Sequence, residues 1–105
     1  MTIRQRCRRD RSFVNEMRIC TIHMHNGDEI GLTPRQQILV RALNHLTTPR
    51  QQLCLYLYYG RQLSQQDIAD ELGIDESTVS RTIAKGEKHI FTVELLLTSP
   101  AEQVG

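Results

Sequence analysis

The segment from Gln62 to Ile90, QLSQQDIADELGIDESTVSRTIAKGEKHI, constrains the fold of this chain more than any other part of it. It predicts two helices joined by a tight turn. Ser64 and Asp67 have the spacing of a reciprocal cap at the start of the first helix. The inner face of that helix consists of three apolar residues, Ile68, Ala69 and Leu72. Gly73 ends it, because glycine takes the left-handed conformation of a helix C-terminus at little steric cost.

The second helix follows Asp75, which we expect to cap it, and has two different faces. The inner face repeats at intervals of four, three and four residues and consists of Val79, Ile83, Gly86 and Ile90. The outer face carries Ser77, Arg81, Lys85 and Lys88. A glycine inside a helix costs up to about 1 kcal/mol relative to alanine, so we expect Gly86 to mark close helix packing. The whole pattern is the sequence form of a DNA-reading helix-turn-helix.

Two more helices are predicted before this motif, and each opens with a Thr-Pro pair. Thr33 caps a helix over about 34–46, and Thr48 caps a helix over about 49–60. The first has one apolar stripe, formed by Ile38, Leu39, Ala42, Leu43 and Leu46. The second is apolar nearly all round, so it is either central in the core or half committed to a partner.

The first 32 residues differ from the rest in charge and in pattern. Met1 to His25 holds six arginines against two acids, whereas the remaining residues hold seven cations against ten acids. A basic arm of this kind can grip DNA phosphates, and a solvated terminus without such a role explains the charge equally well. Residues 17–32 read MRICTIHMHNGDEIGL, in which a β-prone run before Asn-Gly predicts a short β-hairpin or a flexible linker.

Length and composition exclude several classes of protein. The chain has 105 residues, 39% of them apolar and 24% charged, which suits one small globular domain. The three cysteines lie far apart, so we expect neither a disulfide framework nor a metal site, and no cofactor. No stretch approaches the roughly 18 apolar residues of a membrane helix, so we expect a cytoplasmic, nucleoid-associated protein. A glycine-rich phosphate loop, a metal-ligand cluster and a GxSxG motif are all absent, so we expect no enzyme.

Residues 48–90 resemble region 4 of the sigma-70-type sigma factors of bacterial RNA polymerase. The resemblance rests on the opening TPRQQ, the apolar YLYYGRQLS, QQDIADELGI and STVSRTIAKGEKHI. It implies an all-α, winged-helix-like or sigma region 4-like fold of four to five helices, with the helix-turn-helix at 64–90 inside a helical domain 33–97. Residues 1–32 are then a basic arm with a hairpin or linker, and 98–105 a tail. No upstream stretch has the length and aromatic content of the region that melts the promoter, so we expect a stand-alone region 4-like protein.

The resemblance also implies which residues meet DNA. Base edges in the major groove of a promoter −35-like element would be approached by Glu76, Ser77, Thr78, Ser80 and Arg81. Phosphates would be met by Ser64, Gln65, Lys85 and Lys88. An argument independent of the family holds for Arg81, whose planar fork can bond two acceptors of guanine, and for the hydroxyls of Ser77 and Ser80.

Charge and surplus apolar residues point to partners. Residues 61–90 hold four cations against six acids, so the isolated motif should bind DNA weakly. The arginine arm, dimerisation or a DNA-bound partner such as RNA polymerase would make up the shortfall. The apolar residues after Ile90 are Phe91, Val93, Leu95, Leu96 and Leu97, and they either fold back onto the helix 34–46 or form a shared interface. We favour the interface, and hence a homodimer.

Two other functions share this fold and stay open at this stage. One is a protein-binding adaptor that holds RNA polymerase or a sigma factor. The other is a phage DNA-packaging recognition subunit of the small-terminase kind, which also uses a small helix-turn-helix and oligomerises. Fold alone does not separate these functions from that of a transcriptional regulator.

Overall fold

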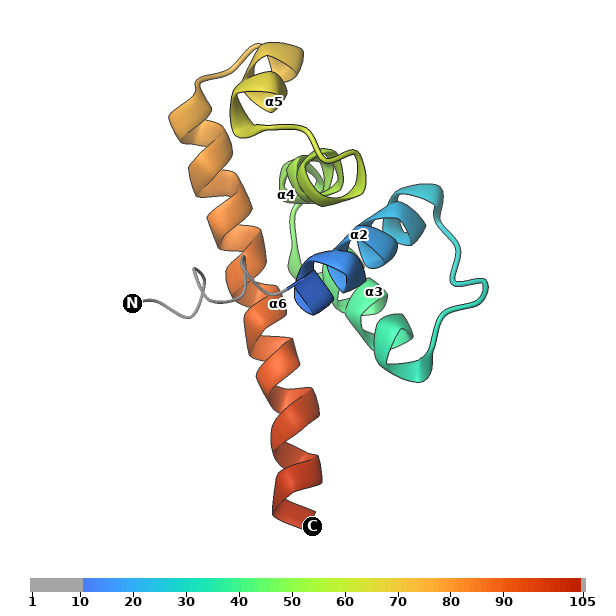
Figure 1. Ribbon diagram of the computed structural model, residues 1–105. Helices are drawn as coiled ribbons and strands as arrows, with labels where there is room; N and C mark the ends of the chain where they lie inside the picture. The colour runs from blue at the N-terminus through green and yellow to red at the C-terminus, as the bar shows by residue number, and fades with distance from the viewer. Residues whose placement is uncertain (1–10, 105) are drawn as a thin grey trace.

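The computed structural model describes the backbone of residues 11–104 and the side chains of residues 11–97. Within this part the chain is helical and contains no strand, which confirms the expected all-α fold. Its elements are α2 (Arg11–Asn26), α3 (Pro34–Leu46), α4 (Pro49–Leu55) running into the π-helical η1 (Tyr56–Gly60), α5 (Gln65–Leu72) and α6 (Glu76–Val104). α6 runs along the long axis of the molecule (Figure 1). The helices α2, α3 and α4 lie along one side of it, and α5 lies at its N-terminal end (Figure 1).

The helix α2 shows that the prediction of a hairpin or linker over residues 17–32 was wrong. Its buried side chains recur at helical intervals and are Phe13, Met17, Cys20, Thr21 and Met24. Thr21, one of the β-prone residues, donates its hydroxyl proton to the carbonyl oxygen of Met17 at 2.7 Å and so fits a buried helix face. Asn26-Gly27 does form a turn, but Gly27 (φ 77°) ends a helix there instead of joining two strands. Burial every three to four residues therefore outweighed local β propensity.

α2 packs against α3 and η1, so residues 11–26 share the core of the residues that follow them. The arginines of the proposed basic arm other than Arg11 and Arg18 lie outside the described residues. At the other end, the backbone of α6 continues without a break through the segment 98–104. The side chains of that predicted tail also lie outside the described part of the chain.

Both Thr-Pro starts are confirmed, and each forms a full capping box. The Thr33 hydroxyl accepts the Gln36 N–H while the Gln36 side chain accepts the Thr33 N–H, both at 3.1 Å. Thr48 and Gln51 repeat this arrangement at the start of α4. Glutamine at the third helical position thus completes two caps that the Thr-Pro signal alone did not specify.

The apolar stripe of α3 is turned relative to the prediction. Leu39 and Leu43 are buried as expected, but Val40 is buried with them, whereas Ile38 and Leu46 are 44% and 47% exposed. α3 packs against both α2 and α6, so its buried side is wider than one stripe and includes Val40. The predicted apolar stripe therefore included the flank of Ile38, whereas the observed buried side includes the flank of Val40.

α4 and η1 occupy the centre of the core, because together they contact α2, α5 and α6. Their buried residues are Cys54, Leu55, Leu57 and Tyr59. Of the two explanations for a helix that is apolar nearly all round, a central position accounts for most of its surface. The last turn widens into a π-helix, in which the Arg61 N–H donates to the Tyr56 carbonyl oxygen at 3.0 Å.

One arginine fastens the distal half of α6 to the body. The Arg35 guanidinium on α3 lies 3.1 Å from a carboxylate oxygen of Glu16 on α2 and 2.5 Å from one of Glu94 on α6. Past Ile90, α6 does not fold back but continues as one helix against α3. Phe91, Val93 and Leu97 pack on the core, while Leu95 and Leu96 are 57% and 63% exposed.

Candidate nucleic-acid interface

The turn of the helix-turn-helix and the start of its first helix lie where the sequence predicts them. Ser64 begins α5, and its hydroxyl accepts the Asp67 N–H at 3.1 Å, which is the side-chain half of the predicted cap. Gly73 ends α5 in the left-handed conformation at φ 69°, with its N–H bonded to the Ala69 carbonyl oxygen. Ile74 donates to the same oxygen at 3.0 Å and is half-buried against the core. These hydrogen bonds fix the turn between α5 and α6 and thereby the direction in which α6 begins.

The inner face of α6 is confirmed in full. Val79, Ile83 and Ile90 have no exposed surface, and Gly86 is buried between them. A Cβ atom at Gly86 would lie 2.8 Å from Leu55 Cδ1, which is closer than two carbons can approach. The glycine therefore lets α6 pack closely on α4, as its position inside a helix indicated.

A buried carboxylate on this inner face was not foreseen. Glu87 is 0% exposed, and its Oε2 accepts the Tyr59 hydroxyl proton at 2.5 Å. Its spacing from Ile83 and Ile90, four and three residues, already placed it on the inner face, but it was counted only as one of six acids in the segment. Since Glu87 points into the core, the charge that this segment presents to solvent is less negative than that count.

The predicted outer face is present. The residues exposed on it are Ser77, Arg81, Lys85 and Lys88. Thr78 and Ser80 are half-buried at its flanks, and Glu76 is exposed in the first turn. Ser80 lies off the stripe because one residue is about 100° around a helix from the next. The remaining candidates lie at the start of α5, with Ser64 exposed and Gln65 half-buried.

The spacing of these side chains along α6 matches the dimensions of DNA. A helix rises about 1.5 Å per residue, so Lys88 lies about 10 Å further along the axis than Arg81. The major groove is about 12 Å wide and admits one helix. The stretch of α6 from Arg81 to Lys88 is therefore comparable in length to the width of the groove.

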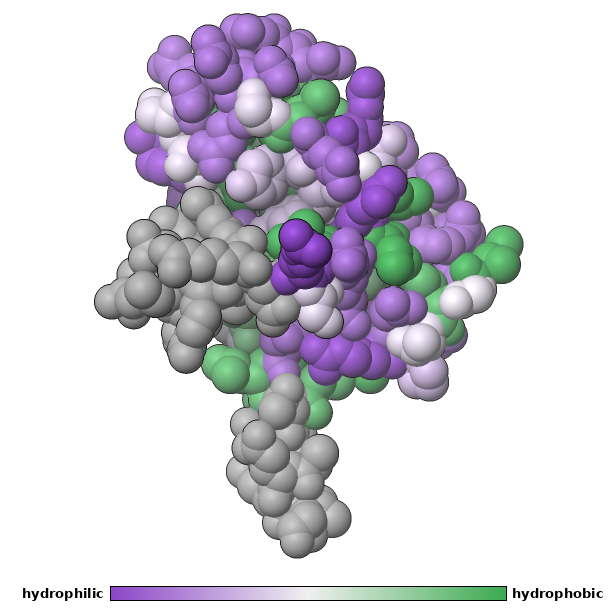
Figure 2. All heavy atoms as spheres, in the orientation of Figure 1, coloured by the Kyte–Doolittle hydropathy of each residue, from purple (hydrophilic) through white to green (hydrophobic). Residues whose placement is uncertain are grey.

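The surface around this face is strongly hydrophilic. Figure 2 shows polar residues covering the end of the molecule formed by α5 and the start of α6, whereas apolar residues gather lower, over the other helices. Much of the polar surface at this end is acidic, and its exposed members are Asp67, Asp70, Glu71, Asp75 and Glu76. Acidic groups repel phosphates, so these five residues are not candidates for phosphate contacts.

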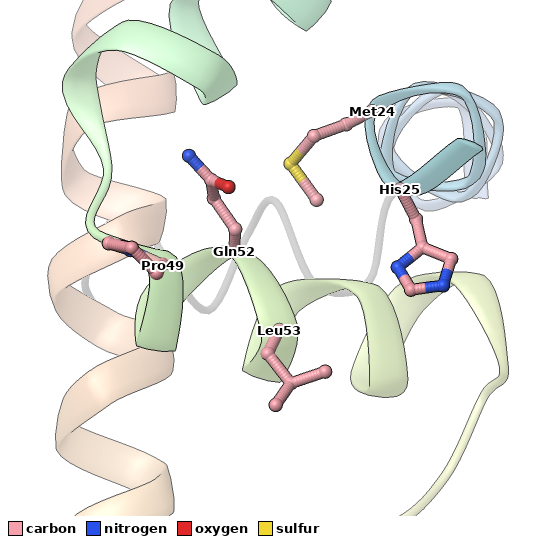
Figure 3. A pocket seen from close by; sticks show the side chains of 5 residues that line it. All are labelled: Met24, His25, Pro49, Gln52 and Leu53. Carbon is pink, nitrogen blue, oxygen red and sulfur yellow. The ribbon is translucent and has the colours of Figure 1, made fainter. Parts of the chain in front are cut away.

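A small open pocket lies away from this face, between α2 and α4. Its lining residues are Met24, His25, Pro49, Gln52 and Leu53 (Figure 3). His25 stacks on Tyr56 with ring centroids 3.9 Å apart, and the Gln52 amide donates to carbonyl oxygens at the end of α3. Its volume of 180 Å³ is below the roughly 300 Å³ at which small-molecule sites begin. The pocket is therefore not a candidate ligand site.

Among the described side chains, residues 11–97, no three His, Cys, Asp or Glu lie together as ligands of a metal ion would. No helix within residues 11–104 combines the length and the hydropathy that crossing a bilayer requires.

A second helix held rigidly by its inner face, with hydroxyl and cationic groups on its outer face, defines a helix-turn-helix DNA-binding domain. The family described as "Sigma-70, region 4" matches residues 36–90, which is more than half of the chain. The chain belongs to this family, whose members are DNA-binding domains and not a class of enzyme. Comparisons with curated proteins and with solved structures give no match. The matched region begins in α3, so α2 and the distal half of α6 lie outside it.

Proposed function

We propose that this chain is a sequence-specific regulator of transcription that binds double-stranded DNA and reads a promoter element with residues 76–90 of α6. The observation that carries the proposal is the position of Arg81. It is exposed in the second turn of α6, while Val79 and Ile83 next to it have no exposed surface. Because the inner face is locked in the core, the guanidinium is presented outward from a fixed backbone.

Each candidate residue has a role that follows from its position. Ser77 and Arg81, which are exposed, contact base edges most directly, and Arg81 bonds O6 and N7 of a guanine. Glu76, Thr78 and Ser80 contact bases at the flanks, and the half-buried pair among them reaches less far. The phosphate contacts come from Ser64, Gln65, Lys85 and Lys88. One bidentate arginine discriminates by about 1 to 3 kcal/mol, so these residues define only a few base pairs.

Additional DNA affinity comes from partners in this proposal. Sigma region 4 domains associate in general with RNA polymerase, and we propose the same for this chain in the cytoplasm. We also propose a homodimer that forms through the distal half of α6. The exposed Leu95 and Leu96 support it, because leucines that lie side by side at more than half exposure are a surface that association would bury. A symmetric dimer reads two half-sites about one helical turn apart.

The proposal is tested by enriching duplexes from a random pool with the purified protein, followed by fluorescence anisotropy on the enriched motif. Arg81→Ala should lose the preference for one base pair, which amounts to about tenfold to a hundredfold in affinity for the motif. Arg81→Lys is the matched variant, since it keeps the charge but not the planar fork. It should bind DNA of any sequence like the wild type and still fail to prefer the motif.

A control arginine lies outside this face. Arg41 on α3 is exposed and pairs with Glu29, so Arg41→Ala should leave the enriched motif unchanged. Failure of the wild type to enrich any motif would contradict the proposal and favour an adaptor that meets DNA only through RNA polymerase. A ring-like oligomer with a mass well above that of a dimer, measured by light scattering, would favour a DNA-packaging subunit.

A further inference from the structure

The inner face of α6 contains one side chain that breaks its apolar character. Glu87 has no exposed surface, and among the side chains of residues 11–97 it is the only Asp, Glu, Lys or Arg that is buried. Its neighbours on this face, Ile83 and Ile90, are fully buried as well. An apolar residue of similar volume would be taken out of water at lower cost than a carboxyl group, so burial alone does not favour glutamate at this position.

The hydrogen-bond partner of Glu87 is held in a fixed place. Tyr59 of η1 is 4% exposed. Its ring contacts the rings of Phe13 and Tyr58 edge to face, with centroids 6.2 Å and 5.0 Å apart. These contacts fix the Tyr59 ring, so its hydroxyl is a stationary donor to Glu87 Oε2 at 2.5 Å.

Next to Glu87, the contact between α6 and α4 has no interlocking side chain on α6. Gly86 faces Leu55 without a Cβ atom of its own. Apolar burial has no preferred direction, whereas a hydrogen bond weakens steeply as it bends. The hydrogen bond between Tyr59 and Glu87 is therefore more sensitive to rotation of α6 about its own axis than the apolar contact beside it.

This rotation also decides where the outer face of α6 points. Ser77 and Arg81 belong to the same unbroken helix as Glu87, so the three residues turn together. Atoms at the surface of a helix lie about 5 to 6 Å from its axis. A rotation of about 20° moves them by about 2 Å, which exceeds the spread of hydrogen-bond lengths. A rotation that separates Glu87 from Tyr59 thus also displaces Arg81 from the base edge that it bonds in the proposed function.

We propose that Glu87 is a positioning residue, which sets the preference of α6 for its base pairs through the hydrogen bond with Tyr59. The inference rests on the proposed function, because it takes α6 to read base edges. Base edges are read by donors and acceptors in fixed places, whereas Lys85 and Lys88 have flexible stems that can follow a small displacement. Loss of the hydrogen bond should therefore reduce the preference for the motif and leave the affinity for DNA of mixed sequence nearly unchanged.

The test compares two substitutions of Glu87. Glu87→Leu removes the hydrogen-bonding group at similar volume, and Glu87→Gln keeps an oxygen that accepts from Tyr59. Each protein is titrated by fluorescence anisotropy with the enriched motif and with a duplex of mixed sequence, at a temperature at which circular dichroism shows it to be folded. Glu87→Leu should lose about tenfold in its preference for the motif, which is the contribution of one bidentate base contact. Its affinity for the mixed duplex should stay within about twofold of the wild type, and Glu87→Gln should keep both affinities.

Two further variants separate positioning from stability. Tyr59→Phe removes the other half of the hydrogen bond and should lose the same preference, and it supplies the answer if Glu87→Leu does not fold. Met24→Ala removes a buried side chain between α2 and α4. It should lower the stability of the protein and leave the preference for the motif unchanged.

Three results would overturn the inference. One is a wild-type preference in folded Glu87→Leu or Tyr59→Phe, another is an equal loss of preference in Met24→Ala, and the third is a loss in Glu87→Gln as large as that in Glu87→Leu. In each case, loss of the preference in Arg81→Ala would leave the proposed function standing. Failure of the wild type to enrich any motif would overturn the proposed function, and this inference with it.

Discussion

The Tyr59 hydroxyl and the Glu87 carboxyl group join η1 to the inner face of α6 through a hydrogen bond of 2.5 Å. Glu87 has no exposed surface and Tyr59 only 4%. A polar group that is taken out of water must be compensated by hydrogen bonds, so this contact favours the orientation of α6 in which Glu87 faces Tyr59.

Removing this hydroxyl should destabilise the fold. Tyr59→Phe keeps the ring, and with it the edge contact to Phe13, but takes a donor from the buried carboxylate. We expect a loss of about 1 to 3 kcal/mol in the free energy of unfolding, measured by urea denaturation. Tyr58→Phe is the matched control, since Tyr58 is half-buried and neighbours Tyr59. Equal stability of the two variants would show that the Tyr59 hydroxyl contributes nothing.

Gly73 should tolerate no ordinary side chain, for a reason that lies in the backbone alone. A Cβ atom there would meet nothing within 4 Å, yet φ is +69°. The left-handed conformation costs L-residues about 1 to 2 kcal/mol, so Gly73→Ala should lower the unfolding free energy by that amount. Gly73→Asn should cost less, because asparagine visits this conformation more readily. Thermal unfolding that ranks alanine above asparagine would contradict this explanation.

Gly86 differs from Gly73, because here the obstacle is a neighbour. Alanine would gain about 1 kcal/mol of helix propensity, but its Cβ would lie 2.8 Å from Leu55 Cδ1, a side chain with no exposed surface. We expect Gly86→Ala to destabilise the protein by about 1 to 2 kcal/mol. In a Leu55→Ala background the same change should be neutral or stabilising. Additive effects in this double-mutant cycle would disprove the close contact.

The Arg35 cluster should produce a specific dependence of stability on pH. Burial chiefly raises the pKa of Glu94 above its usual value, although Arg35 acts in the opposite direction. A carboxyl whose pKa is raised by folding holds its proton longer in the folded state. Its contribution to stability is therefore full at low pH and is lost as the pH rises above 4.5 through the folded-state pKa.

The Glu94→Gln variant isolates this contribution. It cannot titrate at position 94, so its unfolding free energy should decline less than that of the wild type as the pH rises above 4.5. Asp28, whose pKa is lowered mainly by its hydrogen bond with His23, produces the opposite slope at lower pH in both proteins. Parallel curves for wild type and Glu94→Gln would show that the Glu94 pKa is not raised by folding.

The parts of the fold that sequence predicted well are those that local chemistry determines. The caps at Thr33, Thr48 and Ser64 and the turn at Gly73 depend on side chains within a few residues of the helix ends they serve. The inner face of α6 was equally easy to predict from the sequence, because its apolar residues recur regularly over three turns. The helix-turn-helix could therefore be placed almost residue by residue.

The parts that sequence missed depend on contacts between distant segments. For α2, the sequence prediction gave more weight to Asn26-Gly27 and a β-prone run than to the helical spacing of the apolar residues. That spacing has a clear meaning only once α3 and η1 are known to pack against the helix. The buried side of α3 is chosen by two neighbouring helices, so its own pattern left the choice between Ile38 and Val40 open. The spacing of Glu87 indicated the inner face of α6, but its partner, Tyr59, is 28 residues away in the chain and could not be inferred from the local pattern. Which of the outer residues touch DNA stays a prediction.

α6 is one unbroken helix, and it connects the candidate DNA contacts near its N-terminus to the exposed leucines of its distal half. Arg35 holds this helix at Glu94, and Ser77 lies 17 residues nearer to the N-terminus, about 26 Å along the same rod. A tilt of the whole helix by about 5° around Glu94 would move Ser77 by about 2 Å, which exceeds the whole useful range of a hydrogen-bond length. Such a tilt is opposed at Val79, Ile83 and Ile90, whose side chains are fixed in the core. A partner that binds the exposed Leu95 and Leu96 can therefore reorient the candidate DNA contacts only by moving α6 against α4 and α5.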